Sequence, residues 1–446
     1  MITATAFAGK RYAVLGLARS GMAVVRTLVA SGAEVLAWDS RDEPRQAIAS
    51  EFAEKVELAD PVTADLAGFA GVIVSPGVPL NRHPIAEAAA RAGVPVIGDI
   101  ELFALARPDL PAHRVVGITG TNGKSTTTAL VHHLLRSAAL PVRLGGNIGL
   151  PILGQDPLPP GGVYVLELSS YQLDLTRSLC CAVTALLNLS PDHLDRYAGF
   201  DDYVASKGRL LGMQHADQHA VFGVGDAETL AIAMREELRR GPAFVHRADG
   251  ARLAAMQAEW PSLQGPHNLQ NAAVAIGIVE ALGLTEGQWR AAIGSFKGLP
   301  HRMERVAEAN GVLFINDSKA TNPASAAPAL AAFPPSPERR IHWILGGLPK
   351  GEGLGECAPF LGHVAQAYTI GEAGPKFADL LEPHVPVMRS EMMCEAIRQA
   401  MDAARPGDVV LLSPACASFD QFRDFEARGD AFRQIVDAML HGEEEC

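Results

Sequence analysis

The amino-acid sequence predicts an α/β protein with three domains. A chain of 446 residues has room for three domains at roughly 150 residues each. Short apolar runs alternate with helical patterns along the whole length, which is typical of parallel sheets covered by helices. A linker-like segment with two prolines, residues 106–113, separates the first group of elements from the second. We expect the domains at residues 1–110, 111–301 and 302–446.

The composition limits the partners and the location of the protein. The chain has 38 Lys and Arg against 50 Asp and Glu, so its net charge is −12, whereas a general nucleic-acid partner would need a basic surface. The longest apolar run, residues 179–187, is far shorter than the roughly 20 residues of a membrane helix. Residues 1–9 do not resemble a secretion signal, and the six cysteines form no metal-binding pattern. We expect a cytoplasmic protein with no nucleic-acid or membrane partner.

The first domain contains a turn with the features of a nucleotide site. Strands are expected at residues 12–15, 34–38, 72–74 and 94–97, and helices at residues 20–30 and 84–93. The turn at residues 16–21 (GLARSG) is related to the dinucleotide-binding pattern G-x-G-x-x-G, and Asp39 follows the second strand, where such folds place a ribose-binding acid. These residues suit either a nicotinamide cofactor or the diphosphate of another nucleotide.

The second and third domains continue the alternation of strands and helices. In the second, we expect strands at residues 114–118, 163–168 and 183–189, helices at residues 124–138 and 266–282, and a closing stretch at residues 297–302. In the third, we expect strands at residues 312–316, 342–345, 367–370 and 409–412 and a last helix at residues 425–440. Open α/β sheets bind ligands beyond the carboxyl ends of their strands, so the loops there are the first candidates for a site.

The strongest motif is residues 117–126 (GITGTNGKST), between a predicted strand and a predicted helix. Gly120 and Gly123 let backbone amides turn toward phosphate oxygens, and the start of the next helix favours anions. Lys124 can reach the β- and γ-phosphates of a nucleotide, and Ser125 can bind Mg²⁺. Although Ile118 replaces the first glycine of the strict pattern G-x-x-x-x-G-K-[ST], the motif predicts a phosphate-binding loop.

Two further residues follow strands near this loop and suit a magnesium site. Glu167 ends a strand whose residues can be buried on both faces, so its carboxylate needs either an ion pair or a metal. His193 lies just beyond the next strand, where it could instead cap a loop. By contrast, Lys207 has the features of an exposed helical lysine.

In the third domain, three polar loops follow predicted strands. They are residues 315–323 (INDSKATNP), 345–350 (LGGLPK) and 412–418 (LSPACAS). The first could also be a solvated loop that caps a helix, since Thr321 or Asn322 before Pro323 suits a helix start. If these strands lie together, the three loops form one candidate binding edge.

Together these motifs resemble the Mur ligases of bacterial peptidoglycan synthesis, over essentially the whole chain. The phosphate loop resembles their shared ATP loop, and the motifs resembling those of their central domain are residues 167–173 (ELSSYQL), 188–196 and 267–271 (HNLQN). The motifs resembling those of the member that adds D-glutamate are residues 301–302, 317–322 and 413–425. The Asp-Asn-Pro-Arg of the diaminopimelate-adding member is absent, and Asn122 stands where the alanine-adding member typically has His.

The resemblance implies both a fold and a reaction. It implies an N-terminal Rossmann-like domain, a central P-loop ATPase-like domain and a C-terminal Rossmann-like domain. The implied reaction is ATP-dependent ligation of D-glutamate to UDP-N-acetylmuramoyl-L-alanine through an acyl phosphate, which would serve cell-wall synthesis, cell shape and cell division. The implied cofactors are ATP, two Mg²⁺ ions and a CO₂-derived carbamate on Lys207, and we expect a monomer.

The resemblance also implies roles for individual residues. The implied catalytic residues are Lys124, His193 and Lys207, and the implied metal ligands are Ser125, Glu167, His193 and Lys207. The implied ATP contacts are Gly120, Thr121, Asn122, Gly123, Lys124, Ser125, Thr126, Asn271, Arg302 and Asp317. The implied contacts with the UDP substrate are Arg19, Ser20, Gly21, Asp39, Ser40, Arg41, Ser75 and Asn147. The implied contacts with D-glutamate are His193, Lys319, Thr321, Lys350, Ser418 and Phe425.

Three alternatives belong to other reaction or protein classes. A folylpolyglutamate synthetase or another amino-acid ligase of this superfamily would share the ATP loop. An NAD-dependent oxidoreductase would use residues 16–21 but would leave the residues after the linker without a function. A non-catalytic nucleotide-binding switch would use ATP only to order its loops.

Overall fold

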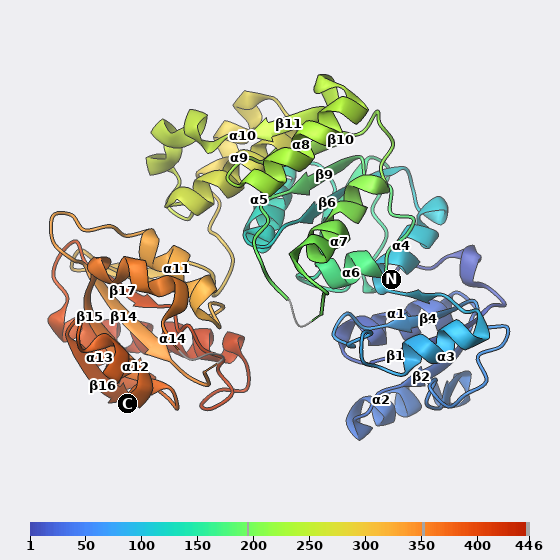
Figure 1. Ribbon diagram of the computed structural model, residues 1–446, viewed down its shortest axis with the longest axis horizontal. Coiled ribbons are helices and arrows are strands. Elements are labelled where there is room, and N and C mark those ends of the chain that lie inside the picture. The colour runs from blue at the N-terminus through green and yellow to red at the C-terminus, as the bar shows by residue number, and fades with distance from the viewer. Residues whose placement is uncertain (194–195, 350–352, 443–446) are drawn as a thin grey trace. The chain divides into compact units, whose positions relative to one another are not determined.

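The computed structural model describes residues 1–193, 196–349 and 353–442. These residues form three β-sheets with helices against them, drawn in blue, in cyan to yellow-green, and in orange to red in Figure 1. The chain divides into two compact units. The first unit, residues 1–251 and 270–293, contains the first two sheets, and the second unit, residues 252–269 and 294–446, contains the third. The predicted α/β class is confirmed.

The first sheet has five parallel strands in the order β3-β2-β1-β4-β5. Its strands are β1 (Arg11–Leu15), β2 (Glu34–Trp38), β3 (Val56–Leu58), β4 (Gly71–Val74) and β5 (Val96–Ile97), and its helices are α1 (Arg19–Ala30), α2 (Asp42–Phe52), α3 (Ile85–Ala92) and α4 (Asp99–Ala106). The order 3-2-1-4-5 is that of dinucleotide-binding folds, in which the crevice between the first and fourth strands receives the ligand. The predicted turn at residues 16–21 lies at this crevice.

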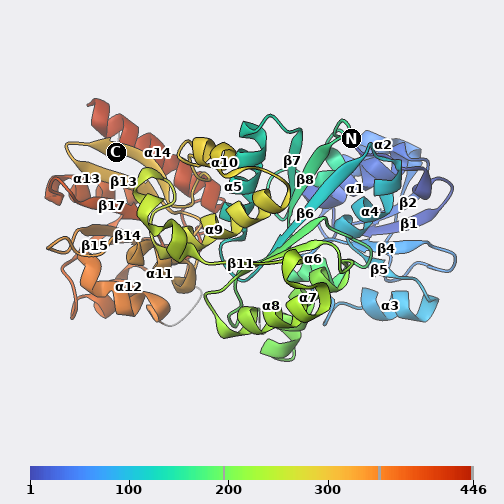
Figure 2. The same ribbon diagram turned by 90° about the horizontal axis from the view of Figure 1, so that it is seen from above.

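The second sheet has six parallel strands in the order β11-β10-β9-β6-β8-β7. They are β6 (His113–Thr119), β7 (Val142–Gly146), β8 (Gly162–Glu167), β9 (Val183–Leu186), β10 (His219–Gly223) and β11 (Val245–Ala248). The helices of this region are α5 (Lys124–Ser137), α6 (Ser170–Asp174), α7 (Phe200–Gly212), α8 (Ala227–Arg240), α9 (Pro266–Ala281) and α10 (Glu286–Ile293). In Figure 2, β6, β7 and β8 run side by side near α5, which contacts all three. The apolar run of β8 is buried throughout, as parallel strands covered on both faces require.

The third sheet has six strands in the order β12-β13-β17-β14-β15-β16. They are β12 (Glu304–Ala309), β13 (Val312–Asn316), β14 (Ile341–Gly346), β15 (Val364–Ile370), β16 (Val387–Glu391) and β17 (Val409–Leu412). The helices are α11 (Pro323–Ala331), α12 (Gly374–Leu381), α13 (Met393–Ala403) and α14 (Phe425–His441). Separate apolar clusters include residues of α11 and α12 on one side and of α13 and α14 on the other, so this sheet too is covered on both faces.

One edge of the third sheet departs from the parallel arrangement that the sequence predicted. Strand β12 pairs with β13 in the antiparallel direction. The two strands are joined at Asn310 and Gly311, whose φ values of 51° and 76° suit a tight hairpin turn. Asn-Gly is a strong hairpin signal, and its favoured turn needs a positive φ at both positions.

Within the first unit, a buried carboxylate on α4 joins the first two sheets. Glu101 is 5% exposed. It accepts hydrogen bonds from the amides of Arg177 and Ser178, at 2.6 and 2.9 Å, and from the Ser178 hydroxyl at 2.7 Å. Nearby, Phe103 of α4 packs edge-on against Tyr164 of β8, and both belong to one apolar cluster.

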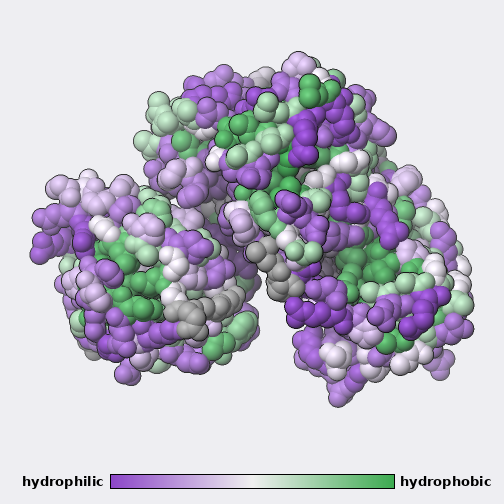
Figure 3. All heavy atoms as spheres, viewed as in Figure 1, coloured by the Kyte–Doolittle hydropathy of each residue, from purple (hydrophilic) through white to green (hydrophobic). Residues whose placement is uncertain are grey.

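The surface in Figure 3 is mostly hydrophilic on the face shown, with scattered hydrophobic patches. Among the described helices, none combines the length and the apolar character that crossing a membrane requires.

Candidate active site

The carboxyl ends of β9, β6 and β8, three neighbouring strands of the second sheet, place the predicted catalytic groups together. The loop after β6 contains the phosphate-binding motif, β8 ends at Glu167, and the loop after β9 leads to His193. Because parallel strands end at one edge, three motifs that are far apart in the sequence become neighbours. This edge is the candidate active site.

The phosphate-binding loop requires glycine at two positions. Gly120 and Gly123 have φ values of 150° and 82°. A Cβ atom at Gly120 would lie 2.8 Å from Leu187 Cβ, and one at Gly123 would lie 2.1 Å from the side-chain oxygen of Asn271 on α9. These contacts exclude larger residues and place the predicted ATP contact Asn271 against the loop.

Asn188, which the sequence reading did not single out, fastens this loop to the loop after β9. Its side-chain oxygen accepts a hydrogen bond from the Asn122 amide at 2.8 Å, and its side-chain nitrogen donates to the Asn122 carbonyl at 3.1 Å. The Thr121 amide donates to the Asn188 carbonyl at 2.9 Å, and the Ser190 amide donates to the Thr121 hydroxyl at 3.1 Å. Asn188 is the first residue of the motif at residues 188–196, which is the signal that the sequence contains.

We expect Asn188→Ala to weaken nucleotide binding. The substitution removes two hydrogen bonds of about 1 kcal/mol each, which corresponds to roughly a 5- to 30-fold rise in the dissociation constant. Calorimetric titration with Mg²⁺ and ADP would measure the change without requiring turnover. Asn188→Asp keeps the acceptor for the Asn122 amide but puts a carboxylate oxygen against the Asn122 carbonyl and adds negative charge to the loop, so it should also weaken binding. Unchanged affinity in both variants would show that the loop does not depend on this clamp.

Two lysines share one carbonyl of the loop. Lys124 Nζ and Lys207 Nζ each donate to the Gly120 carbonyl at 2.8 Å, and Lys124 also donates to the Thr121 carbonyl at 2.7 Å. The expectation of an exposed Lys207 is wrong, because its residue on α7 is only 2% exposed and its ammonium lies 4.7 Å above the Tyr203 ring. Burial, together with the charge of Lys124, lowers the pKa of Lys207 to about 6.

Glu167 has a carboxylate oxygen that is suited to a cation. The residue is 2% exposed, and its Oε1 accepts a hydrogen bond from the Asn147 side chain at 3.1 Å. Its Oε2 is buried and has no hydrogen-bond partner among the described residues. Ser125, also buried, lies in the first turn of α5 and supplies a second oxygen of the type that Mg²⁺ prefers.

No group of three or more His, Cys, Asp or Glu side chains among the described residues could hold a metal ion alone. Mg²⁺ commonly binds one or two carboxylates together with water and substrate phosphates. The donor set of Glu167 and Ser125 therefore fits a Mg²⁺ ion that arrives with a nucleotide.

His193 occupies an unusual backbone conformation in the same region. Its φ is 54°, in the left-handed region, and its side chain is 44% exposed. The imidazole Nε2 lies 3.4 Å from Asp192 Oδ2, and the ring centroid lies 4.9 Å from that of Tyr171. The imidazole is therefore accessible to a ligand beside an acidic and an aromatic side chain.

The first sheet gathers most of the predicted UDP contacts near one crevice. Ser20 and Gly21 lie in the first turn of α1, which follows β1. Ser75 follows β4, and its hydroxyl donates to the Gly16 carbonyl at 3.0 Å. Asp39 follows β2, with Ser40 and Arg41 directly after it. Arg19 is exposed at the start of α1.

Asp39 is engaged by protein groups in this crevice. Its two carboxylate oxygens accept from the amides of Leu17 and Arg41, at 2.8 and 3.0 Å. Burial opposes ionisation of Asp39, but these hydrogen bonds outweigh it and lower its pKa. The carboxylate therefore orders the turn and the residue after it.

The third sheet brings a second group of candidates together at the carboxyl ends of β13, β17 and β14. Asp317 accepts hydrogen bonds from the Met303 amide and the Ser413 hydroxyl, and burial raises its pKa to about 7. Lys319 Nζ lies 3.9 Å above the ring of Phe425. Asn322 caps α11 and Pro323 begins it, so the predicted helix cap is confirmed. The expectation of a solvated loop is wrong, because Asp317, Ser318 and Ala320 are buried.

The remaining candidates are distributed as follows. Ser418 is buried in the loop after β17, whereas Thr321 is partly buried in the loop after β13. Arg302 precedes β12, and Lys350 lies outside the described residues. Arg302 and Asp317 belong to the second unit, and the phosphate-binding loop belongs to the first.

Family models match three consecutive parts of the chain. The Mur ligase MurD-like N-terminal domain matches residues 10–98, the Mur ligase middle domain matches residues 118–279, and the Mur ligase glutamate ligase domain matches residues 301–416. Each match contains one of the three sheets or most of it.

Curated relatives match over nearly the full length. The UDP-N-acetylmuramoylalanine--D-glutamate ligase of Novosphingobium aromaticivorans is 70% identical over 444 residues, covering 100% of this chain and 98% of the relative. The ligase of the same name from Sphingopyxis alaskensis is 59% identical, covering 98% of this chain and 100% of the relative. That of Zymomonas mobilis is 52% identical with the same coverage.

Solved structures share the fold at low sequence identity. A UDP-N-acetylmuramoyl-L-alanyl-D-glutamate--2,6-diaminopimelate ligase matches with a TM-score of 0.54 at 20% identity, covering 86% of this chain and 95% of that one. The UDP-N-acetylmuramate-alanine ligase of Thermotoga maritima matches with a TM-score of 0.54 at 16% identity, covering 97% and 99%.

Proposed function

Because this chain belongs to the Mur ligase family, we propose that it ligates D-glutamate to UDP-N-acetylmuramoyl-L-alanine at the expense of ATP, a step of peptidoglycan precursor synthesis. The observation that carries the proposal is the edge of the second sheet. There a glycine-dependent loop, Lys124 and the buried oxygen of Glu167 lie together. The relatives that share 52 to 70% of the sequence are named for this reaction.

The proposed reaction has two steps. The alanyl carboxylate of the UDP substrate takes the γ-phosphoryl group of ATP, forming an acyl phosphate and releasing ADP. The amine of D-glutamate then attacks the acyl carbon, and a proton and inorganic phosphate leave as the amide forms. Activation is needed because a carboxylate is a poor electrophile. Catalysis of this kind depends mainly on positioning and on charge stabilisation.

The residues at the second sheet edge suit the first step. When ATP binds, Lys124 would turn from the loop carbonyls toward the phosphates, and the loop amides and the start of α5 would bind the phosphate oxygens. The proposed ATP contacts are Gly120, Thr121, Asn122, Gly123, Lys124, Ser125, Thr126, Asn271, Arg302 and Asp317. Mg²⁺, when bound, neutralises phosphate charge; its proposed ligands are Ser125, Glu167, His193 and a carbamate on Lys207. Two ions are proposed, one held by Ser125 and Glu167 and the other by His193, and the carbamate would add an oxygen donor of the type that Mg²⁺ prefers. The buried amine of Lys207 favours its neutral form, which is the form that reacts with CO₂.

The other two sheets would bind the remaining substrates. We assign residues 1–110 to the UDP substrate, residues 111–301 to ATP, and residues 302–446 to both ATP and D-glutamate. The proposed contacts with the UDP substrate are Arg19, Ser20, Gly21, Asp39, Ser40, Arg41, Ser75 and Asn147. The proposed contacts with D-glutamate are His193, Lys319, Thr321, Lys350, Ser418 and Phe425. The protein would act as a monomer in the cytoplasm.

The test is the substrate dependence of phosphate release. We expect release from ATP to require both UDP-N-acetylmuramoyl-L-alanine and D-glutamate, since the acyl phosphate is consumed only by the amine. With the UDP substrate labelled by ¹⁸O in its carboxylate, one labelled oxygen should appear in the released phosphate. ATP turnover that ignores the amino acid would favour a nucleotide switch, and a screen of folates and L-amino acids would detect another ligase of the superfamily.

A further inference from the structure

A buried arginine on α14 joins the loops at the edge of the third sheet. Arg428 is 1% exposed. Its Nε donates to the Ser318 hydroxyl at 3.0 Å, and one terminal nitrogen donates to the carbonyls of Ser318 and Cys416 at 2.9 and 3.0 Å. The other terminal nitrogen donates to the Ala417 carbonyl at 3.2 Å. One side chain thus joins the loop after β13 to the loop after β17.

The loop after β14 is attached to the same arrangement. The amide of Leu348 donates to the Ala417 carbonyl at 2.9 Å, and the amide of Ala417 donates to the Leu348 carbonyl at 2.9 Å. The Ala417 carbonyl therefore accepts from both Leu348 and Arg428. In addition, the Ser318 hydroxyl donates to the Phe425 carbonyl at 2.9 Å, which connects the loop after β13 to the start of α14.

The positive charge of Arg428 is not balanced by a carboxylate in direct contact. Among the described residues, Arg428 forms hydrogen bonds with carbonyl and hydroxyl oxygens but no ion pair. Burial lowers the pKa of Arg428 to about 10, although electrostatic interactions with Cys416 and Asp420 partly oppose this. An arginine remains charged at neutral pH under these conditions, so the loops surround an uncompensated cation.

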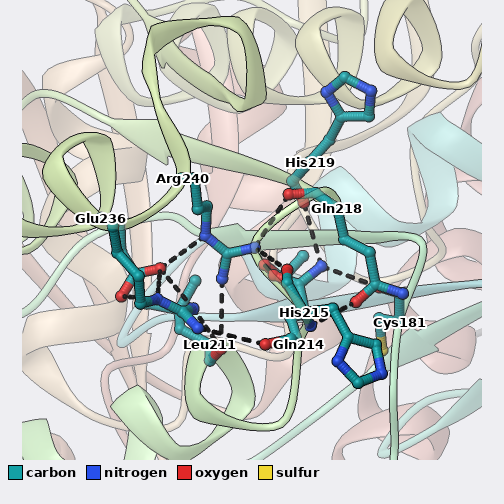
Figure 4. A network of polar contacts seen from close by, with 10 residues as sticks. Cys181, Leu211, Gln214, His215, Gln218, His219, Glu236 and Arg240 are labelled. Atoms are coloured by element: carbon teal, nitrogen blue, oxygen red, sulfur yellow. Dashed lines mark hydrogen bonds and ion pairs between the residues drawn. The ribbon is translucent and has the colours of Figure 1, made fainter.

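Arg240 is a second buried arginine, and it serves as a structural comparison for Arg428. Figure 4 shows Arg240 of α8, which donates to the carbonyls of Leu211, His215 and Gln218. Unlike Arg428, it also pairs with a carboxylate, Glu236 Oε2, at 2.6 Å. Glu236 Oε2 also pairs with Arg239 at 2.6 Å, so one carboxylate serves both arginines. Arg240 nevertheless has a direct ionic partner, which Arg428 lacks among the described residues.

We infer that Arg428 is a positioning residue of the amino-acid site: it fixes the loops that contain Lys319, Thr321 and Ser418, and its unbalanced charge favours an amino acid with a second carboxylate. This rests on the proposed function, which assigns D-glutamate to these loops. A carboxylate ligand bound over the loops would compensate a charge that the protein itself leaves unpaired. Arg428 itself lies beneath the loops and acts through them.

The experiment compares Arg428→Met and Arg428→Lys with Arg240→Met. We expect Arg428→Met to raise the KM for D-glutamate at least about tenfold, to raise the KM for ATP much less, and to reduce the preference for D-glutamate over D-glutamine. Arg428→Lys keeps the charge but has fewer hydrogen-bond donors. It should therefore raise the KM for D-glutamate while retaining more of the preference over D-glutamine than Arg428→Met does. Arg240→Met should lower the melting temperature without changing the KM for D-glutamate or the preference for D-glutamate over D-glutamine.

The outcomes separate this inference from the proposed function. A wild-type enzyme that prefers another acidic amino acid would refute the assignment of D-glutamate but support the role of Arg428, whereas a preference for a neutral amino acid would refute that role. Equal KM values and equal preferences in Arg428→Met and Arg240→Met would also overturn the inference. If Arg428→Met does not fold, an Arg428→Lys variant with wild-type KM and preference would overturn it as well.

Discussion

Lys207→Ala should lower ligase activity by about 10³-fold, the scale seen when a preorganised charged group is removed from an active site. Lys207 is buried, and its amine donates a hydrogen bond to the carbonyl of Gly120 in the phosphate-binding loop. A carbamate on this amine would replace a cation with an oxygen ligand beside the nucleotide. Added formate or acetate should fill the vacated space and restore part of the activity of the alanine variant.

The measurement is initial rate against carboxylate concentration, with Lys55→Ala as a control for the loss of an exposed lysine. Carbon-13 NMR of wild-type protein in labelled bicarbonate should show a carbamate that is missing from Lys207→Ala. Full activity of Lys207→Ala would remove the residue from the site. Lost activity without rescue and without a carbamate signal would indicate that Lys207 acts as an amine.

Glu167→Gln should also cause a large loss of activity, about 10²- to 10³-fold at a fixed Mg²⁺ concentration. Glutamine keeps an oxygen that can accept from Asn147, but it removes the charge on the side that has no partner among the described residues. The Mg²⁺ concentration for half-maximal rate should rise, since a neutral amide binds Mg²⁺ less well than a carboxylate does.

Glu101→Gln is the matched control for this variant. Glu101 is a buried glutamate of the same unit whose oxygens already accept from Arg177 and Ser178. Its replacement should lower thermal stability and leave the Mg²⁺ dependence unchanged. An unchanged Mg²⁺ dependence in Glu167→Gln would exclude Glu167 as a metal ligand.

The sequence predicted those parts of the protein in which local patterns decide the structure. The expected strands at residues 34–38, 312–316 and 409–412 agree with β2, β13 and β17. Their apolar runs, together with the turn residues beside them, define both ends. The phosphate-binding loop was predictable for a similar reason, because Gly120 and Gly123 are needed by the backbone itself.

Features that depend on tertiary contacts were not predictable. Nothing in the residues around Lys207 indicates that α7 buries it against the loop after β6, so its pattern suggested a surface lysine. Asn188 hydrogen-bonds to Asn122, 66 residues away in the sequence, and Arg428 to Ser318, 110 residues away. Such pairings leave no periodic signal in the sequence. The hairpin at Asn310 and Gly311 is different, because the Asn-Gly pair is itself a local hairpin signal in the sequence.

The left-handed backbone of His193 determines which substitutions at this position can be interpreted. An alanine there would remove the imidazole and also lose some tolerance of the left-handed conformation, since His is more frequent at positive φ than most residues. Asparagine tolerates a positive φ better than most residues, so His193→Asn changes the chemistry with less effect on the backbone. A loss of activity shared equally by His193→Asn and His193→Ala could then be attributed to the missing imidazole. A loss confined to His193→Ala would be caused by the change in backbone conformation.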